Sequence, residues 1–131
     1  VPGEIIPSNE FYDYDAKYVD GKSQAVIPAQ LPRRVITQVQ RTAIAAYKAI
    51  DCAGMARADF FVVRGSGAIY MNELNTIPGF TSISMYAKLW QASGLSFSAL
   101  LDRLIELAIE RHQQKSGLRR FYDPSKDWYR R

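Results

Sequence analysis

Residues 55 to 75, "MARADFFVVRGSGAIYMNELN", carry the pattern that decides the fold. Two runs of strand-forming residues flank a glycine-containing turn, which is the signal of a β-hairpin. Side chains two positions apart in a strand point to the same face, so Arg57 shares a face with Asp59, and Glu73 shares one with Asn75. We therefore expect these four polar side chains to converge if the register makes the two faces coincide.

The length of the hairpin turn sets that register. In one register Val63 pairs with Ala68. Asp59 then lies opposite Asn72, and Glu73 points to the other face unless a bulge follows. A three-residue Gly-Ser-Gly loop instead places Asp59 directly opposite Glu73, and such loops commonly end in a left-handed residue, which a glycine accepts. We expect this second register because the sequence permits it and a shared site requires it.

The polar groups of the hairpin are chemically coherent. Asp59, Glu73 and Asn75 offer two carboxylates and an amide oxygen, the hard ligands that Mg²⁺ prefers, and Mg²⁺ usually adds water and phosphate oxygens to its shell. Arg57 beside them could neutralise charge on a transferred phosphoryl group or on an acyl oxygen. This combination indicates a nucleotide. The alternative is that both carboxylates solvate the exposed face of a sheet.

A glycine turn with neighbouring hydroxyl groups follows the second strand. Gly79 offers backbone N–H groups, and Thr81, Ser82 and Ser84 add hydroxyl donors suited to a carboxylate or a phosphate. Two structural alternatives stay open. Ser84 is an acceptable helix N-cap, and the Pro-Gly pair could simply end the strand.

Composition narrows the class of protein. A chain of 131 residues with 47% hydrophobic content can bury one core. No apolar run approaches the roughly 20 residues of a membrane-spanning helix, and the first residues resemble no secretion signal, so we expect a cytoplasmic protein without a membrane partner. The single Cys52 suits a reducing compartment, and the sole histidine, His112, has no nucleophile partner that would suggest a catalytic triad.

The net charge of +4 lies at the C-terminal end. Residues 115–131 hold six basic residues against two acidic ones, so residues 1–114 sum to zero. Aromatic residues accompany these arginines, as in anion-binding segments. We favour a solvated tail, because termini are usually poorly ordered, and expect no nucleic-acid partner.

Periodicity outside the hairpin predicts helices and short strands. The predicted helices cover 32–51, 84–92 and 96–117, and the strand-like pieces cover 4–6 and 25–27. The apolar positions expected to be buried are Val35, Val39, Ala43, Ala46, Tyr47 and Ile50 in the first helix, and Leu100, Leu101, Leu104, Ile105, Ala108 and Ile109 in the last. A long irregular loop is expected at 8–18.

Four stretches resemble the C-terminal part of the D-alanine–D-alanine ligases, a family of the ATP-grasp superfamily. They are "EFYDYDAKY" (10–18), "GMARADFF" (54–61), "NELNTIPGFTSISMY" (72–86) and "LWQASGLSFSALLDRLIELAIER" (89–111), within a resemblance that covers roughly residues 3–112. It implies an α+β ATP-grasp C-terminal subdomain, in which helices pack an antiparallel sheet with a β-hairpin core, together with a long ω-loop.

The resemblance also implies an activity. ATP phosphorylates the carboxylate of one D-alanine, and the amine of a second attacks the D-alanyl phosphate, which gives D-alanyl-D-alanine for peptidoglycan. Asp59, Glu73 and Asn75 match ligands of two Mg²⁺ ions, for which Mn²⁺ could substitute, and Glu73 would bridge the ions near the nucleotide phosphates. Arg57 matches the group that stabilises the acyl phosphate and the oxyanion.

Further positions match the substrate contacts of the family. The Gly79 N–H matches a donor to the tetrahedral intermediate, and Ser84 with the Met85 backbone matches the group that binds the carboxylate of the second D-alanine. On the ω-loop, Lys17 would approach the phosphates, Tyr18 would help to close the site and Phe11 would lie against the nucleotide. Phe11 and Tyr18 could instead be aromatic residues that anchor the loop, and Lys17 could be a solvated charge. The Lys17-Tyr18 pair favours D-alanine over D-lactate as acceptor.

The family pattern extends beyond this sequence. Complete ligases have N-terminal and central domains that are absent here, so we expect 1–114 to be a C-terminal catalytic portion that is inactive unaided, followed by a basic aromatic tail at 115–131. The full enzyme is expected to be a homodimer. The alternative is a non-catalytic remnant that weakly binds Mg²⁺-nucleotide or an anionic partner.

Overall fold

A computed structural model of the chain describes residues 1–6, 24–81 and 83–118. Its strands are β1 (Glu4–Ile6), β2 (Gln24–Val26), β3 (Arg57–Val62) and β4 (Ile69–Asn75), and its helices are α2 (Arg33–Ala49), α3 (Met85–Ala92) and α4 (Phe97–Ser116). β1 pairs with β2 and β3 pairs with β4, both antiparallel. The α+β class and the elements predicted from periodicity are confirmed, with ends that agree to within two residues.

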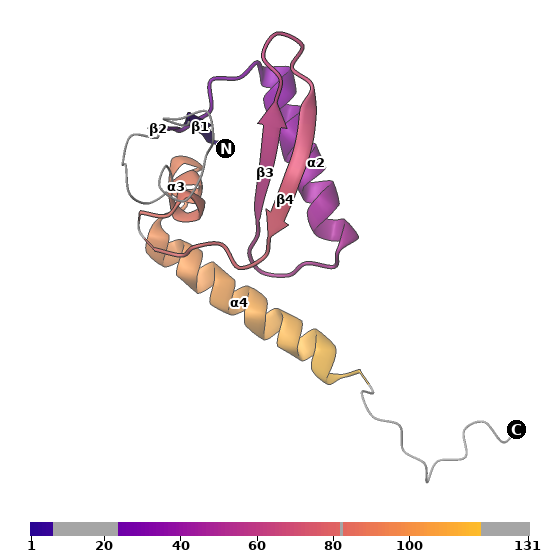
Figure 1. The fold of residues 1–131 in the computed structure, drawn as a ribbon. Helices are drawn as coiled ribbons and strands as arrows, with labels where there is room; N and C mark the ends of the chain where they lie inside the picture. The colour runs from indigo at the N-terminus through magenta and orange to yellow at the C-terminus, as the bar shows by residue number, and fades with distance from the viewer. Residues whose placement is uncertain (7–23, 82, 119–131) are drawn as a thin grey trace, which may run out of the picture.

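Helix α2 runs along the β3–β4 hairpin (Figure 1). Its Val35 and Val39, one helical turn apart, are only 2% and 8% exposed, so the apolar stripe predicted for this helix begins as a buried face. The hairpin tip approaches this stripe closely. A Cβ added to Gly67 would lie 3.1 Å from Val35 Cγ2, and Gly67 has φ +69°, which is the left-handed conformation predicted for it.

Asp59 and Glu73 face each other as expected, but the turn and the register that bring them together differ from the prediction. The Val63 N–H donates to the Ala68 carbonyl at 2.9 Å, so the turn contains four residues, and the prediction of a three-residue loop was wrong. The register then shifts by one between Asp59 and Phe60, because β4 contains an extra residue, Asn72, in a β-bulge.

The bulge restores the pairing that the four-residue turn by itself would have prevented. Asp59 lies opposite Glu73, and Arg57 lies opposite Asn75. The turn and the far end of the hairpin therefore have different registers, and the far end has the one that a shared site requires.

The segment after β4 is anchored by aromatic side chains to the last two helices. Phe80 stacks on Phe97 with ring centroids 5.3 Å apart and lies 5.8 Å from the ring of Tyr86. Tyr86 and Leu100 are 6% and 3% exposed and form a small core between α3 and α4. Helix α4 begins as predicted, since Ser96 Oγ accepts a hydrogen bond from the Ala99 N–H at 3.3 Å.

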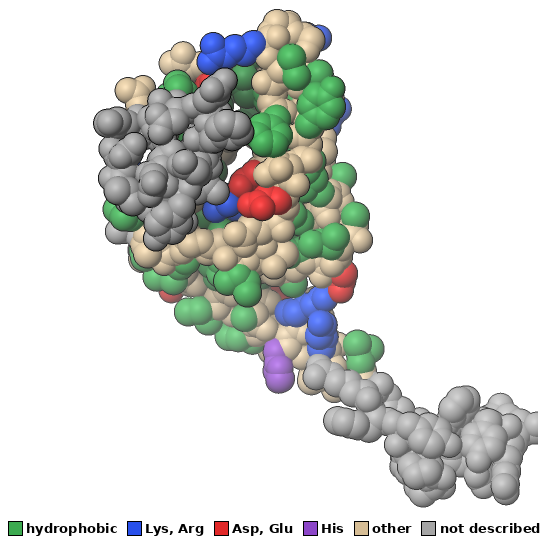
Figure 2. Space-filling view, viewed as in Figure 1, with side chains coloured by type: hydrophobic (Ala, Val, Ile, Leu, Met, Phe, Trp, Pro, Cys, Tyr) green, Lys and Arg blue, Asp and Glu red, His purple; other side chains and the backbone are tan. Residues whose placement is uncertain are grey.

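The distal part of α4 departs from the predicted burial. Leu101, Ile105 and Ile109 are 38%, 58% and 53% exposed, so the expectation that they are buried was wrong, as it was for Ala108, which is also exposed, and for Ile50 at 57%. Periodicity located an apolar stripe, but no element among the described residues covers it. The hydrophobic side chains that reach the surface on one face are visible in Figure 2.

The end of α4 is tied to the loop that follows α2. Arg111 Nη2 donates to Asp51 Oδ2 at 2.6 Å, and Asp51 has a positive φ of 47°.

No helix in the described segments is both long and apolar enough to cross a membrane.

Candidate functional site

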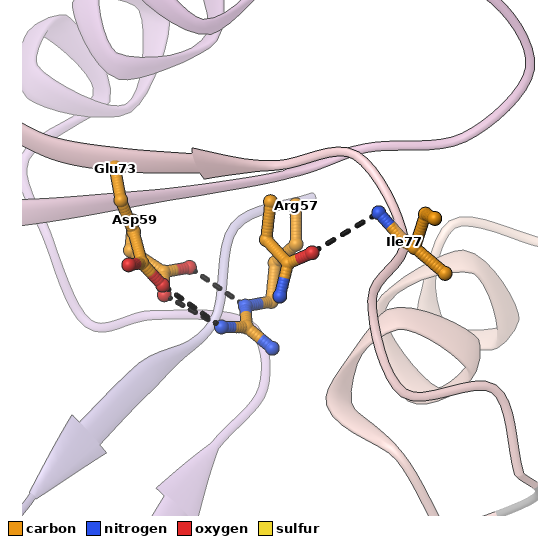
Figure 3. Close-up of polar contacts among 5 residues, drawn as sticks. Arg57, Asp59, Glu73 and Ile77 are labelled. Carbon is orange, nitrogen blue, oxygen red and sulfur yellow. Dashed lines mark hydrogen bonds and ion pairs between the residues drawn. The ribbon is translucent and has the colours of Figure 1, made fainter.

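Three charged side chains meet on one face of the β3–β4 hairpin, as the strand alternation predicts (Figure 3). Arg57 donates from Nε to Asp59 Oδ1 and from Nη2 to Asp59 Oδ2, both at 2.8 Å. The same Nη2 lies 3.4 Å from Glu73 Oε1. The guanidinium therefore links a carboxylate on its own strand to a carboxylate on the facing strand.

The opposite charges in this arrangement attract each other, and the side chains remain accessible to a ligand. The planar guanidinium matches a carboxylate with two parallel hydrogen bonds, and its charge offsets the repulsion between the two acids. The side chains of Arg57, Asp59 and Glu73 remain 31%, 34% and 54% exposed. Because each carboxylate oxygen can accept more than one bond, a cation could share these oxygens with Arg57. Figure 2 shows acidic and basic side chains side by side over the hairpin.

Asn75 occupies the end of β4 and faces the turn that follows. Its Oδ1 accepts a hydrogen bond from the Ile77 N–H at 3.0 Å (Figure 3). An amide oxygen has a second lone pair, so this bond leaves room for a metal ligand role. In the described part of the chain, no three Asp, Glu, His or Cys residues are grouped to hold a metal ion. The two carboxylates and the Asn75 amide are oxygen donors of the kind that Mg²⁺ prefers.

The glycine turn brings two further candidates together. A Cβ added to Gly79 would lie 3.4 Å from Ser84 Oγ. The Thr81 N–H donates to Ser84 Oγ at 3.1 Å, and the two hydroxyl oxygens are 2.8 Å apart. Ser84 occupies the N-cap position of α3, yet its side chain makes no capping bond there and turns back to Thr81 instead. Met85 follows as the first residue of the helix.

Burial affects the ionisation of Tyr86, which packs against this turn through Phe80. Desolvation raises the pKa of the Tyr86 phenol, and a hydrogen bond with Trp90 partly opposes the shift. Tyr86 therefore stays neutral at physiological pH and acts as an aromatic anchor for Phe80 rather than as a charged group.

Several site features had no clear sequence signal. Alternation placed Arg57 and Asp59 on one face but did not indicate their ion pair, and no pattern indicated that Thr81 bonds to Ser84. Phe11, Lys17 and Tyr18, predicted on the ω-loop, lie outside the described residues and remain predictions.

Hard oxygen ligands beside a guanidinium, next to a glycine turn with hydroxyl groups, define a class of site suited to a divalent cation and an anionic substrate. Residues 1–106 match a family model described as the D-ala D-ala ligase C-terminus. The chain belongs to the D-alanine–D-alanine ligase family and corresponds to its C-terminal part.

Individual relatives agree with this assignment. The D-alanine–D-alanine ligase of Thermoanaerobacter sp. strain X514 is 60% identical over 116 residues, which are 88% of this chain and 32% of that protein. The chain thus spans about a third of the length of the curated relatives it matches.

Solved structures show the same fold. The D-alanine–D-alanine ligase from Coxiella burnetii is 51% identical with a TM-score of 0.69, over 72% of this chain and 27% of that one. The ligase from Bacillus anthracis, complexed with ATP, is 36% identical with a TM-score of 0.69, over 86% of this chain and 36% of that one.

Proposed function

We propose that this chain supplies the metal-binding and acceptor-binding portion of an ATP-dependent D-alanine–D-alanine ligase, which makes D-alanyl-D-alanine for peptidoglycan. The observation that carries the proposal is the convergence of Arg57, Asp59 and Glu73 on one hairpin face, in a chain of this family. The relative complexed with ATP supports a nucleotide as co-substrate. The remaining length of the relatives would supply the rest of the nucleotide site.

The proposed reaction has two steps. A carboxylate oxygen of the first D-alanine attacks the γ-phosphorus of ATP, the bond to the β-phosphate oxygen breaks, and ADP leaves. The amine of the second D-alanine then attacks the acyl carbon, the bond from that carbon to the phosphate oxygen breaks, and phosphate leaves as the amine loses a proton. Both steps develop negative charge, which Arg57 would stabilise.

Asp59, Glu73 and Asn75 would hold the metal, which we propose to be two Mg²⁺ ions or Mn²⁺ in their place. When bound, the metal offsets the charge of the nucleotide phosphates. Glu73, whose side chain is 54% exposed, would offer its carboxylate to both ions. Arg57 holds the Asp59 carboxylate in place through its two hydrogen bonds.

The turn after β4 would bind the acceptor. The Gly79 N–H would donate to the developing oxyanion, while the Ser84 hydroxyl and the Met85 N–H would bind the carboxylate of the second D-alanine. Ser84 and Met85 stand at the start of α3, where the unpaired N–H groups and the helix dipole favour an anion. On the ω-loop, Lys17 would approach the phosphates, Tyr18 would help to exclude water and Phe11 would contact the nucleotide.

The test joins this chain to the N-terminal two-thirds of the Thermoanaerobacter ligase, in place of the matching part of that protein. We expect the joined protein to release phosphate from ATP only with D-alanine and Mg²⁺ present, and to form the dipeptide. The chain alone should show no turnover and serves as the control. A correctly folded joined protein that binds ATP yet makes no dipeptide would contradict the proposal and favour a non-catalytic remnant.

A further inference from the structure

Three hydrogen bonds lock Thr81 to Ser84. The Ser84 N–H donates to the Thr81 carbonyl at 3.0 Å, the Thr81 N–H donates to Ser84 Oγ at 3.1 Å, and the two hydroxyl oxygens lie 2.8 Å apart. We propose that Thr81 is a positioning residue, whose hydroxyl turns the Ser84 O–H outward to the carboxylate of the acceptor amino acid. This inference rests on the proposed function, in which Ser84 binds that carboxylate.

The argument follows from counting the lone pairs on one oxygen. A serine hydroxyl has one donor and two acceptor positions. The Thr81 N–H fills the first acceptor position on Ser84 Oγ. If the Thr81 hydroxyl donates to the second, the Ser84 proton has no acceptor left within the pair and must point away from it. A carboxylate can only accept, so an outward-pointing O–H is the group it needs.

The fold keeps this pair in place before a substrate arrives. Phe80, directly before Thr81, is held between Phe97 and Tyr86 by ring contacts of 5.3 and 5.8 Å. On the other side, the Lys88 N–H donates to the Ser84 carbonyl at 3.1 Å and anchors Ser84 to the first turn of α3. A hydroxyl oriented in advance loses less rotational freedom on binding, which is why Thr81 would improve affinity without touching the substrate.

The experiment uses the joined protein and compares Thr81→Val, Thr81→Ser and Ser84→Ala. Thr81→Val keeps the shape and the backbone N–H but removes the hydroxyl, so we expect the KM for the second D-alanine to rise about fivefold, the effect of one hydrogen bond, with kcat nearly unchanged. Thr81→Ser retains a hydroxyl and should recover most of this loss. Thr37→Val is the matched control, because it removes a threonine hydroxyl that bonds to the Arg33 carbonyl within α2.

A double-mutant cycle separates positioning from direct contact. If Thr81 acts through Ser84, Thr81→Val should add nothing to the KM of Ser84→Ala. Additive effects would overturn the inference, because they would mean that Thr81 binds the substrate itself. A Thr81→Val variant no weaker than the Thr37→Val control would also overturn it.

The same set of variants keeps the inference separate from the proposed function. If Ser84→Ala raises the KM for the second D-alanine and Thr81→Val does not, the inference alone fails. If Ser84→Ala itself leaves that KM unchanged, the acceptor role proposed for Ser84 fails, and the inference fails with it. Thermal unfolding of each variant shows whether a change in KM follows from loss of the fold.

Discussion

Arg57 occupies both carboxylate oxygens of Asp59, with its Nε and Nη2 atoms each 2.8 Å from one of them. A metal ion bound to Asp59 would have to share these oxygens with the guanidinium. Arginine keeps its charge at all relevant pH values, so Arg57 and a bound cation repel each other while both attract the same carboxylates. Under the proposed function, Arg57 would have opposite effects on metal binding and on catalysis.

Replacing Arg57 with alanine should separate these effects. In this chain alone, Arg57→Ala should tighten Mn²⁺ binding about two- to fivefold, because it removes a competing cation from exposed carboxylates. In the joined protein, the same change should lower dipeptide formation by a factor of about 100 or more, because charge on the acyl phosphate loses its stabilising partner. Titration of free Mn²⁺ by electron paramagnetic resonance measures the first effect, and a coupled ADP assay measures the second.

Arg103→Ala provides the control for this experiment, since Arg103 pairs with Glu106 and Glu110 on the exposed surface of α4. It should change neither readout. Weaker Mn²⁺ binding in the Arg57→Ala chain would show that Arg57 organises the carboxylates more than it competes for them.

Replacing Glu73 with glutamine should abolish dipeptide formation and leave the fold intact. The change keeps the size of the side chain but removes the negative charge of the proposed bridging ligand. Because Glu73 is 54% exposed and its contact with Arg57 is 3.4 Å, the free energy of unfolding should change by less than about 1 kcal/mol. Turnover and thermal unfolding are measured together. Glu106→Gln on α4 is the matched control, and near-normal turnover in Glu73→Gln would remove the metal assignment.

Deleting Asn72 should be tolerated. Both halves of the hairpin are already paired, with Phe60 opposite Met71 and Asp59 opposite Glu73, so removing the extra residue makes the ladder continuous and keeps the two carboxylates facing each other. We expect the joined protein without Asn72 to retain dipeptide formation within about tenfold, because Asp59 and Glu73 stay paired and any distortion is local.

Deleting Phe61 from β3 is the contrasting change. Phe61 is 65% exposed, so its loss removes little buried surface, but it increases the mismatch between the strands from one residue to two. This variant should lose activity and unfold at lower urea concentration. If the two deletions behave alike, the register does not control the site.

The ion pair between Arg111 and Asp51 predicts a dependence of stability on pH. The hydrogen bond and charge of Arg111 lower the pKa of the Asp51 carboxyl from its ordinary value of 3.8. A carboxyl whose pKa is lower in the folded than in the unfolded state stabilises the fold above the unfolded value, and this stability is lost as the pH falls through the folded value. Asp51→Asn should therefore lower stability at neutral pH and reduce its further loss below about pH 3.8.

Urea unfolding at neutral and acidic pH measures this effect. Asp102→Asn is the control, because Asp102 takes part in no ion pair that the structure shows within residues 24–81 and 83–118. An Asp51→Asn chain that loses as much stability in acid as the parent would contradict the role given to this pair.

The sequence predicted the elements of the fold and the face on which the charged residues meet. Strand alternation needs only the spacing of Arg57, Asp59 and Glu73, and helical periodicity needs only the spacing of apolar residues. The turn length was predicted wrongly. A three-residue and a four-residue turn differ by a single pairing step, and the glycines of this loop allow both turns.

The remaining features depend on tertiary contacts. A bulge at Asn72 has no signature in its residue type, and its existence follows from the pairing of the strands on either side. The exposure of Ile105 and Ile109 could not be inferred from an apolar pattern, because periodicity identifies a face and not what covers it. The bonds between Thr81 and Ser84 arise from the path of the turn, which aromatic packing of Phe80 holds in place.

The bulge also lies between the tip of the hairpin and its charged end. Asn72, the residue of β4 without a partner in the ladder, lies between the tip and the pairing of Asp59 with Glu73. Gly65 and Ser66 at the tip are exposed, whereas Gly67 rests on Val35. The bond between residues 65 and 66 is thus the place to insert a fluorescent or affinity label, which would report on this hairpin without disturbing its carboxylates.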